Sequence, residues 1–301
     1  MQKLAIYSLT FRQKNTLIGW SFVLPAVGLL SVFGIGSIAY VLYLSLLRWN
    51  LIDPTPTFVG LANYNQLLHS TSFLHAILRT LFYLVVSTGI TLPLSLFLAV
   101  LLHEPFRGVR IFRALFFIPY VAPTVASAIA WSWLFEPHHG LINYFLRVFH
   151  MPAQPWLGSP NQAMLVIILL YVWQFTGYFI VLFLNGLQNV PVPLYEAAQM
   201  DGANRWQQFY RVTLPMITPT LFFVMTMSII FSFLSFDQVY VLTNGGPADS
   251  TTTIIYYLFL QGFQFFHIGI AAAVAVLLLL FLAVITYLQF KGESKWVHHQ
   301  M

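Results

Sequence analysis

The sequence has no cysteine and few charged residues. Without cysteine, the chain of 301 residues forms no disulfide, offers no thiolate to a metal and carries no cysteine nucleophile. Charged residues make up 7% of the chain, against about a quarter in a soluble domain, while 59% of its residues are hydrophobic. So few charges cannot cover a water-soluble fold, which excludes an ordinary cytosolic enzyme, a disordered chain and a nucleic-acid-binding domain. The class that remains is a polytopic membrane protein.

Long uncharged stretches predict six membrane-spanning helices, because one span needs about 20 mostly apolar residues. The first stretch extends over about 30 residues. It is far longer than the core of a signal peptide, which has about 7–15 residues, and predicts a retained helix. The fold class is therefore an all-α polytopic membrane protein. Its spans are predicted near residues 18–45, 79–102, 113–136, 162–187, 214–243 and 267–290.

Basic residues predict the orientation, since cytoplasmic loops are enriched in Lys and Arg. An even number of spans places both termini on one side. Ten basic residues lie on that side and three on the other, so the N- and C-termini are predicted to be cytoplasmic. The ten are Lys3, Arg12, Lys14, Arg107, Arg110, Arg113, Arg205, Arg211, Lys291 and Lys295, and the three are Arg48, Arg79 and Arg147. The predicted parts are a tail (1–16), a first helix with its outer loop (17–75), a core of five helices (76–290) and a second tail (291–301).

Common motifs for nucleotide and metal sites are absent from the sequence. It contains neither the GxxxxGK[ST] loop that cradles ATP phosphates nor an HExxH zinc motif. Paired histidines occur at 138–139 and 298–299, where solvated helix ends explain them better than a metal site. Asp237 is the only carboxylate well inside a predicted span. Such a residue is a functional-site hypothesis by default, and it could bind substrate, pair with a partner subunit or line a gate.

The longest predicted cytoplasmic loop, residues 188–213, contains a short helix of its own. Pro193 followed by Leu-Tyr-Glu-Ala-Ala is a good helix start, with an acidic side chain near the positive end of the helix dipole. Gly202 can end that helix or allow close approach of another backbone. Small side chains on a surface helix let it fit into a groove on a partner; the alternative is an ordinary interfacial helix between two spans.

This loop resembles the EAA loop of the permease subunits of binding-protein-dependent ABC transporters. The resemblance is specific because several residues recur at the family's spacing, although Val212 stands where the family usually has Ile. The matching residues are Glu196-Ala197-Ala198, Gly202 after three residues, Val212 after nine more, and Leu214-Pro215.

Two further segments resemble one branch of that family, the carbohydrate permeases of the maltose and glycerol-3-phosphate type. Phe58–Tyr64 (FVGLANY) is similar to the first outer loop of this branch. Phe236-Asp237 and the following Leu242–Pro247 (LTNGGP) are similar to the end of its fifth span. The resemblance covers about residues 20–290 and places the chain with the maltose-permease-like half of the heterodimer.

The resemblance implies a type I importer permease fold and a subunit that is not itself an enzyme. The implied partners are a second permease subunit, an ATPase dimer that binds ATP and Mg²⁺, a periplasmic or lipid-anchored substrate-binding protein, a sugar substrate and membrane lipid, but no nucleic acid. No cofactor is expected in this chain, which would lie in the bacterial inner membrane. The residues assigned to ATPase coupling are Glu196, Ala197, Ala198, Asp201, Gly202, Leu214 and Pro215.

The resemblance also implies substrate contacts on the fourth and fifth spans. Aromatic faces can stack on sugar C–H surfaces, while Gln, Ser and Asp exchange hydrogen bonds with hydroxyls. Small and aromatic residues at helical spacing also pack spans together, so packing stays an alternative. Only the positions of Tyr178 and Ser228 keep the residue types of the maltose permease, and the bulk of Phe175 favours a smaller or differently shaped glycoside. The predicted contacts are Tyr171, Gln174, Phe175, Tyr178, Ser228, Ser232 and Asp237.

Three other functions stay open at this stage. A secondary carrier for a small polar solute would need coupling-ion or proton groups in the spans, and Asp237 alone gives it little support. A permease for glycerol-3-phosphate would share the EAA loop, although no Lys or Arg lies mid-span to meet a phosphate. An intramembrane enzyme would need a cluster of nucleophile, base or metal ligands in the spans, and the sequence suggests none.

Overall fold

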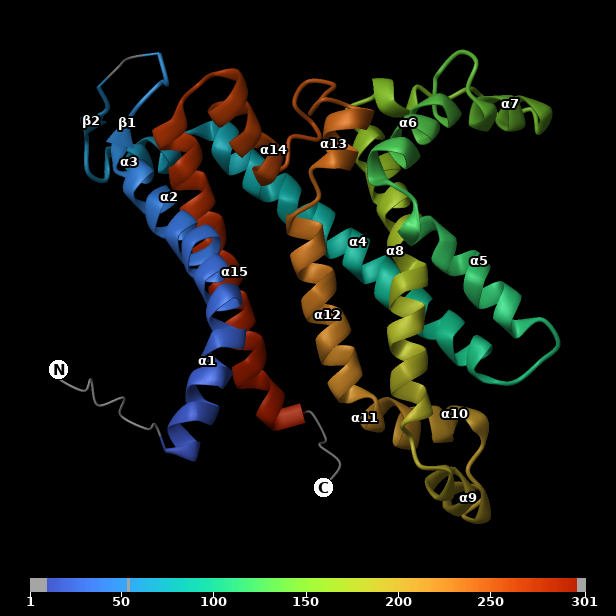
Figure 1. The fold of residues 1–301 in the computed structure, drawn as a ribbon. Helices are drawn as coiled ribbons and strands as arrows, with labels where there is room; N and C mark the ends of the chain where they lie inside the picture. The colour runs from blue at the N-terminus through green and yellow to red at the C-terminus, as the bar shows by residue number, and fades with distance from the viewer. Residues whose placement is uncertain (1–9, 53–54, 297–301) are drawn as a thin grey trace. The chain divides into compact units, whose positions relative to one another are not determined.

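The computed structural model describes residues 10–52 and 55–296, and almost all of its regular structure is helical (Figure 1). Within the described residues, four helices are long and apolar enough to cross a membrane, and two bent helix pairs bring the number to six if each pair forms one span. The predicted all-α fold is confirmed. The predicted cytoplasmic location of the termini and the predicted boundaries after residues 16, 75 and 290 stay predictions. The chain divides into two compact units, residues 1–66 with 261–276, and residues 67–260 with 277–301.

The first unit contains the first span and a small structured cap. The span Ile18–Ser45 is formed by α1 (Phe11–Leu29), the π-helical segment Leu30–Gly36 and α2 (Ser37–Ser45). It leads into a two-stranded antiparallel ribbon of β1 (Leu47–Arg48) and β2 (Thr57–Phe58), in which Leu47 pairs with Phe58. The π-helical segment Leu260–Gln264 precedes α15 (Ile268–Trp296), which begins in this unit and continues into the second.

The FVGLANY segment builds that cap. Buried Asn63, in α3 (Ala62–Leu68), donates from Nδ2 to the carbonyl oxygens of Ser45 and Leu47, each at 2.8 Å. The Tyr64 hydroxyl lies 2.7 Å from the Ser45 Oγ. A Cβ on Gly269 would lie 1.9 Å from the Leu47 carbonyl oxygen, so only glycine fits at this point of α15. The FVGLANY segment, which resembles the first outer loop of the carbohydrate permeases, therefore has a structural role in this cap.

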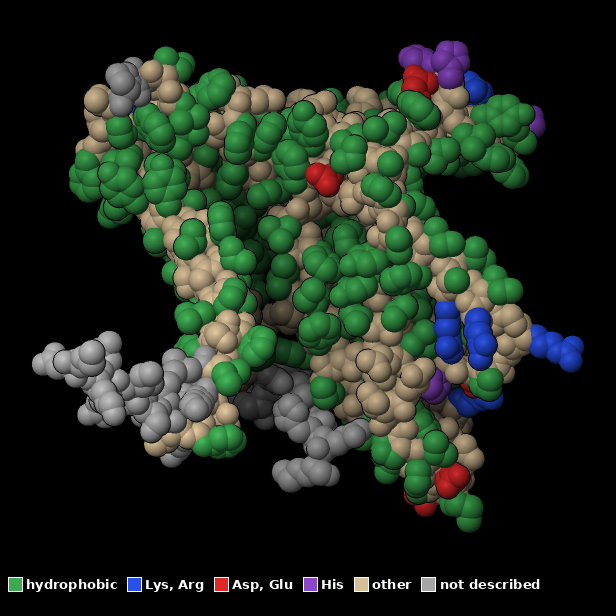
Figure 2. Space-filling model, in the orientation of Figure 1, with side chains coloured by type: hydrophobic (Ala, Val, Ile, Leu, Met, Phe, Trp, Pro, Cys, Tyr) green, Lys and Arg blue, Asp and Glu red, His purple; other side chains and the backbone are tan. Residues whose placement is uncertain are grey.

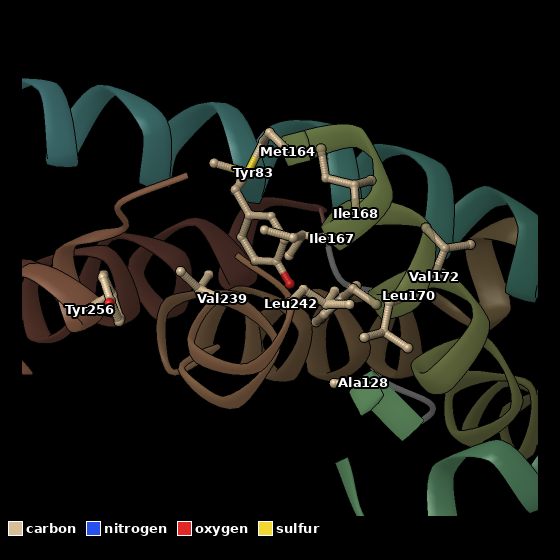
Figure 3. Close-up of a cluster of buried hydrophobic side chains, with 11 residues drawn as sticks. Tyr83, Ala128, Met164, Ile167, Ile168, Leu170, Val172, Val239, Leu242 and Tyr256 are labelled. Atoms are coloured by element: carbon tan, nitrogen blue, oxygen red, sulfur yellow. The ribbon is translucent and has the colours of Figure 1, made fainter. Parts of the chain in front are cut away.

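The second unit is built around α8 (Ala163–Gln188), which packs mainly against α4 (Thr71–His103) and α5 (Val109–Val121). Buried residues of α4 recur every three or four positions and include many small or hydroxylated side chains, which let membrane helices approach closely. They are Phe73, Ala76, Thr80, Tyr83, Ser87, Thr91, Ser95, Ala99 and Leu102. Figure 3 shows Tyr83 reaching into a cluster with Ile167 and Leu170 of α8 and Val239 of α13 (Asp237–Leu242).

The third predicted span is not one straight helix. It consists of α5 and α6 (Thr124–Leu134), which are bent by 96° relative to each other. The break lies at Ala122, which is extended, and Pro123, which lacks a backbone N–H and disfavours helical geometry in the residue before it. The short helices α7 (Leu141–Val148) and the 3₁₀ turn Trp156–Gly158 then lead to α8.

The fifth predicted span, 214–243, is also shorter and bent. The segment Arg205–Met216 meets α12 (Thr218–Phe233) at 69°. The helix ends at Phe233, and Asp237 begins the separate helix α13 instead of interrupting a continuous span. The helix α14 (Ile254–Phe259) follows. Asp237 is therefore at a helix start, half-buried.

Candidate functional site

The loop after α8 folds into the short helix α9 (Val192–Met200), as the sequence predicts. Pro193 lies in its first turn, where the missing N–H costs no hydrogen bond. Gly202 follows the helix with φ +76°, in the left-handed region that glycine adopts without strain. The Gly202 N–H donates to the Gln199 carbonyl at 3.0 Å, and the Ala203 N–H donates to the Ala198 carbonyl at 2.9 Å. These two bonds form a Schellman motif that closes the helix.

Most of α9 is exposed. Glu196 and Ala197 are exposed and Ala198 is half-buried, while Val192 and Met200 are 64% and 89% exposed. Figure 2 shows acidic side chains at the tip of this part of the second unit. A short helix that presents small, acidic and apolar side chains to its surroundings is suited to insertion into a partner's cleft.

One side-chain bond ties α9 to the chain that leads into α12. The Tyr195 hydroxyl lies 2.9 Å from the Oγ1 of buried Thr213, at the end of the π-helical segment Phe209–Thr213. Leu214 and Pro215 follow in the single turn α11 (Leu214–Met216) and are half-buried. The sequence reasoning did not single out Tyr195, because a tyrosine beside the EAA residues does not reveal its partner 18 positions away.

The helix α10 (Arg205–Gln208) begins with a capping box that the sequence analysis also missed. Asn204 accepts from the Gln207 N–H at 2.9 Å, and the Gln207 side chain accepts from the Asn204 N–H at 2.8 Å. The spacing of a cap residue and Gln three positions later is the readable signal. Arg205 pairs with Glu104 at 2.9 Å, so the loop after α9 is connected to the end of α4.

The hydroxyl residues assigned to substrate contact lie in a packed interface of α4, α8 and α12. Ser228 and Ser232 are buried, and their partners are hydroxyl groups of the other two helices. The Tyr171 hydroxyl donates to the Ser228 carbonyl at 3.2 Å. The Ser228 Oγ lies 3.0 Å from the Thr88 Oγ1, and the Ser232 Oγ lies 3.4 Å from the Ser87 Oγ. For Tyr171, Ser228 and Ser232, these contacts favour helix packing over direct sugar binding.

Aromatic side chains form a second, more open group. Phe175 stacks on Tyr171 with ring centroids 4.5 Å apart, and Tyr178 stacks on Tyr120 at the same distance. Phe231 of α12 lies 5.3 Å from Phe175 and 5.9 Å from Tyr178. Phe175, Tyr178, Tyr120 and Phe231 are all half-buried, so they combine stacking surface with access. Sequence reasoning found Phe175 and Tyr178 but not their partners on the other helices.

The side chain of Gln174 keeps unused hydrogen-bonding capacity. Buried Gln174 donates to the Thr124 Oγ1 at 3.0 Å, while its Oε1 has no partner among the described residues. A buried acceptor without a donor is costly and is a place where a hydroxyl ligand can bind. Asp237 is half-buried and lies at the start of α13. Among the described residues, no group of three or more His, Cys, Asp or Glu could hold a metal ion, and His298–His299 lie outside them.

Known proteins resemble the chain over most of its length. Residues 71–291 match the family described as "Binding-protein-dependent transport system inner membrane component". The chain is 35% identical to the sn-glycerol-3-phosphate transport system permease protein UgpA of Yersinia enterocolitica, over 92% of this chain and 94% of that protein. It is 33% identical to the trehalose/maltose transport system permease protein MalF of Thermococcus litoralis, over 88% and 90%.

A solved structure has the same fold. It is a chain of a bacterial alginate ABC transporter in complex with an alginate pentasaccharide-bound periplasmic protein. The TM-score is 0.84 at 21% sequence identity, and the alignment covers 96% of this chain and 98% of that chain. The bent helix pairs are therefore compatible with a membrane-spanning permease fold.

Proposed function

Because the chain belongs to the family of inner membrane components of binding-protein-dependent transport systems, we propose that it is a permease subunit of an ATP-driven importer for a sugar, polyol or glycoside. Members of this family are multi-pass inner-membrane transport subunits and are not enzymes. The observation that carries the proposal is the exposed helix α9, closed at Gly202 and tied through Tyr195 to the segment that leads into α12. A stiff exposed helix attached to a span is the element that a transporter needs to receive force from a soluble partner.

In this proposal α9 is the lever of the transport cycle. A second permease subunit completes the path, and each of two ATPase subunits receives one such helix in a cleft. ATP and Mg²⁺ bind in the ATPases, and this chain holds no cofactor. A substrate-binding protein delivers the sugar from outside. When the ATPases close, α9 moves with them, and the Tyr195–Thr213 bond passes the motion to α12.

The proposed substrate is neutral. The aromatic group at Phe175 and Tyr178 and the unsatisfied Gln174 Oε1 suit sugar faces and hydroxyls. Glycerol-3-phosphate is the second candidate, because a relative with 35% identity is named for its transport. A neutral sugar and glycerol-3-phosphate differ in charge. A transport assay that measures how strongly each inhibits uptake of the other separates the two candidates.

The proposal is tested by isolating the tagged chain from its host in mild detergent and identifying the proteins that remain bound. A second six-span permease and a P-loop ATPase are expected. The isolated complex, reconstituted in vesicles with its binding protein, is expected to take up labelled sugar only when ATP is supplied. A chain that stays alone and transports solute without ATP would overturn the proposal and favour the secondary carrier.

Tyr178→Ala is expected to raise the KM for sugar about fivefold, because one stacking contact contributes about 1 kcal/mol. The measurement is ATP-driven uptake in vesicles against sugar concentration. Tyr171→Phe is the structural counterpart: it removes a hydroxyl bonded inside the protein and should lower stability by about 1 kcal/mol with little change in KM. Equal KM values for wild type and Tyr178→Ala would remove Tyr178 from the substrate path.

Asp237→Asn is expected to lower uptake at sub-saturating sugar about tenfold or more. A hydrogen bond to a charged group contributes about 1.5–3 kcal/mol, and Asn keeps the shape while removing the charge. The amount of inserted protein, measured by immunoblot of membranes, should not change. Unaltered uptake would remove Asp237 from the mechanism.

A further inference from the structure

An apolar groove lies between α4 and the segment formed by α10 and Phe209–Thr213. The groove has a volume of about 410 Å³, and the surface that lines it is mostly apolar. Phe97 and Trp206 remain 61% and 68% exposed, so the groove is open at the surface of the second unit. Its lining residues are Pro93, Leu96, Phe97, Val100, Arg205, Trp206 and Phe209. In a membrane protein, a groove of this volume with apolar walls is suited to hold a hydrocarbon chain.

Both signs of charge lie together at this groove. Arg205 belongs to the lining, and its Nη1 lies 2.9 Å from the Glu104 Oε1. The two side chains are 86% and 65% exposed. A guanidinium has five N–H donors and a carboxylate has two acceptor oxygens, so this pair keeps unused donors and acceptors. A ligand with a positive and a negative group therefore finds a partner for each.

Exposed aromatic rings lie beside the charged pair. Trp206 stacks on Tyr210, with ring centroids 6.0 Å apart and planes at 16°, and Tyr210 is 58% exposed. Trp and Tyr are enriched at the level of lipid headgroups, because their rings are apolar and their tips polar. The surface thus combines hydrocarbon-binding residues, interfacial aromatic rings and an ion pair. These suit, in turn, the acyl chain, the interfacial region and the charged headgroup of a phospholipid.

We propose that this groove binds an ethanolamine phospholipid. An acyl chain lies along Leu96, Phe97 and Val100, the phosphate accepts from Arg205, and the ammonium group donates to Glu104. An anionic headgroup without an amine would place its charge beside the Glu104 carboxylate. A choline headgroup has no N–H to donate. The paired charges therefore select the zwitterion that can both accept and donate hydrogen bonds.

The site is tested by tryptophan quenching with phospholipids brominated on their acyl chains. The purified protein, with any subunits that remain bound, is placed in phosphatidylcholine nanodiscs containing an equal small fraction of brominated phosphatidylethanolamine, phosphatidylglycerol or phosphatidylcholine. The signal of Trp206 is the difference between wild type and Trp206→Phe, and Trp133→Phe, at an exposed tryptophan outside the lining, is the matched control. Brominated phosphatidylethanolamine should associate about fivefold more tightly than phosphatidylcholine, which corresponds to about 1 kcal/mol.

Two charge variants test how the headgroup is selected. Glu104→Gln should reduce the preference for phosphatidylethanolamine over phosphatidylcholine to about one and improve the binding of phosphatidylglycerol. Arg110→Gln changes an exposed arginine outside the lining and should leave the preference unchanged. Equal quenching by all three lipids in the wild type overturns the proposal. So does the absence of Trp206 quenching, which would mean that a partner subunit covers the groove. Neither result depends on the transported substrate.

Discussion

Replacing Gly177 with alanine is expected to disrupt the packing of α5 against α8 and to lower sharply the yield of folded protein. A Cβ at this position would lie 1.8 Å from the carbonyl oxygen of Phe116 and 2.4 Å from its carbonyl carbon. Both atoms belong to the backbone of α5, so no side chain can rotate away and the helices must separate. Overpacking commonly costs about 1–3 kcal/mol, and this clash falls at or above the upper end of that range.

The matched control for Gly177 is Gly89, which lies inside α4 and has no atom within 4 Å of the position that a Cβ would take. Gly89→Ala should leave stability unchanged or raise it by about 0.5–1 kcal/mol, because glycine weakens a helix interior. Both variants are compared by thermal unfolding in detergent, followed by size-exclusion chromatography. Similar midpoints for wild type and Gly177→Ala would contradict the close crossing of α5 and α8.

The long helices could be predicted because the membrane imposes their length. The fourth predicted span, 162–187, differs from α8 by one residue at each end. The second was predicted to begin at 79, yet α4 begins at Thr71 after Ser70 accepts from the Phe73 N–H at 3.3 Å. Arg79 therefore does not mark the start of the helix. Charge marks where a span is buried in lipid, whereas capping determines where its helix starts.

The breaks in the spans were harder to predict. Pro93 and Pro119 lie inside α4 and α5, whereas Pro123 lies at a break of 96°. The residue type is the same in each case, so proline alone does not distinguish a tolerated kink from a sharp bend. What distinguishes Pro123 is the backbone before it: Ala122 is extended, whereas Pro93 and Pro119 lie within continuous helices.

The candidate sites show the same limit. The EAA helix and its glycine end are local features, and the structure has both where the sequence predicts them. The partners of Ser228 and Ser232 lie on α4, about 140 residues earlier in the chain. The spacing of Ser87, Thr91 and Ser95 indicates a polar face of α4, but it does not say which helix this face meets. The substrate roles of Ser228 and Ser232 stay predictions.

Replacing Gly202 with valine is expected to abolish ATP-driven transport while the chain still inserts into the membrane. No atom lies within 4 Å of a Cβ at this position, so the substitution meets no steric clash inside the chain. Its effect comes from φ +76°, which costs a non-glycine residue about 1–2 kcal/mol and is least suited to a β-branched one. When Gly202 leaves this conformation, the bonds to Gln199 and Ala198 break, and α9 loses its fixed end and direction.

A control for local strain is available at Gly108, which has φ +90° and also has no atom within 4 Å of a Cβ. Gly108→Val imposes a similar backbone cost next to α5 but leaves α9 unchanged. It should keep most of the transport activity, whereas Gly202→Val should lose more than tenfold. Equal losses in the two variants would mean that strain in any loop on this side is damaging, and that α9 has no special role.

Asparagine at position 202 separates two reasons for the glycine. Asn tolerates the left-handed region better than Ala, although its side chain is larger. If the backbone conformation is what matters, Gly202→Asn retains more transport than Gly202→Ala. If α9 sits in a partner's cleft that leaves no room for a side chain, Gly202→Asn is the more damaging of the two. Uptake and ATP hydrolysis are measured together for each variant, since loss of uptake with continued hydrolysis identifies α9 as the link between them. Loss of membrane insertion in Gly202→Val would instead make the glycine a purely structural residue.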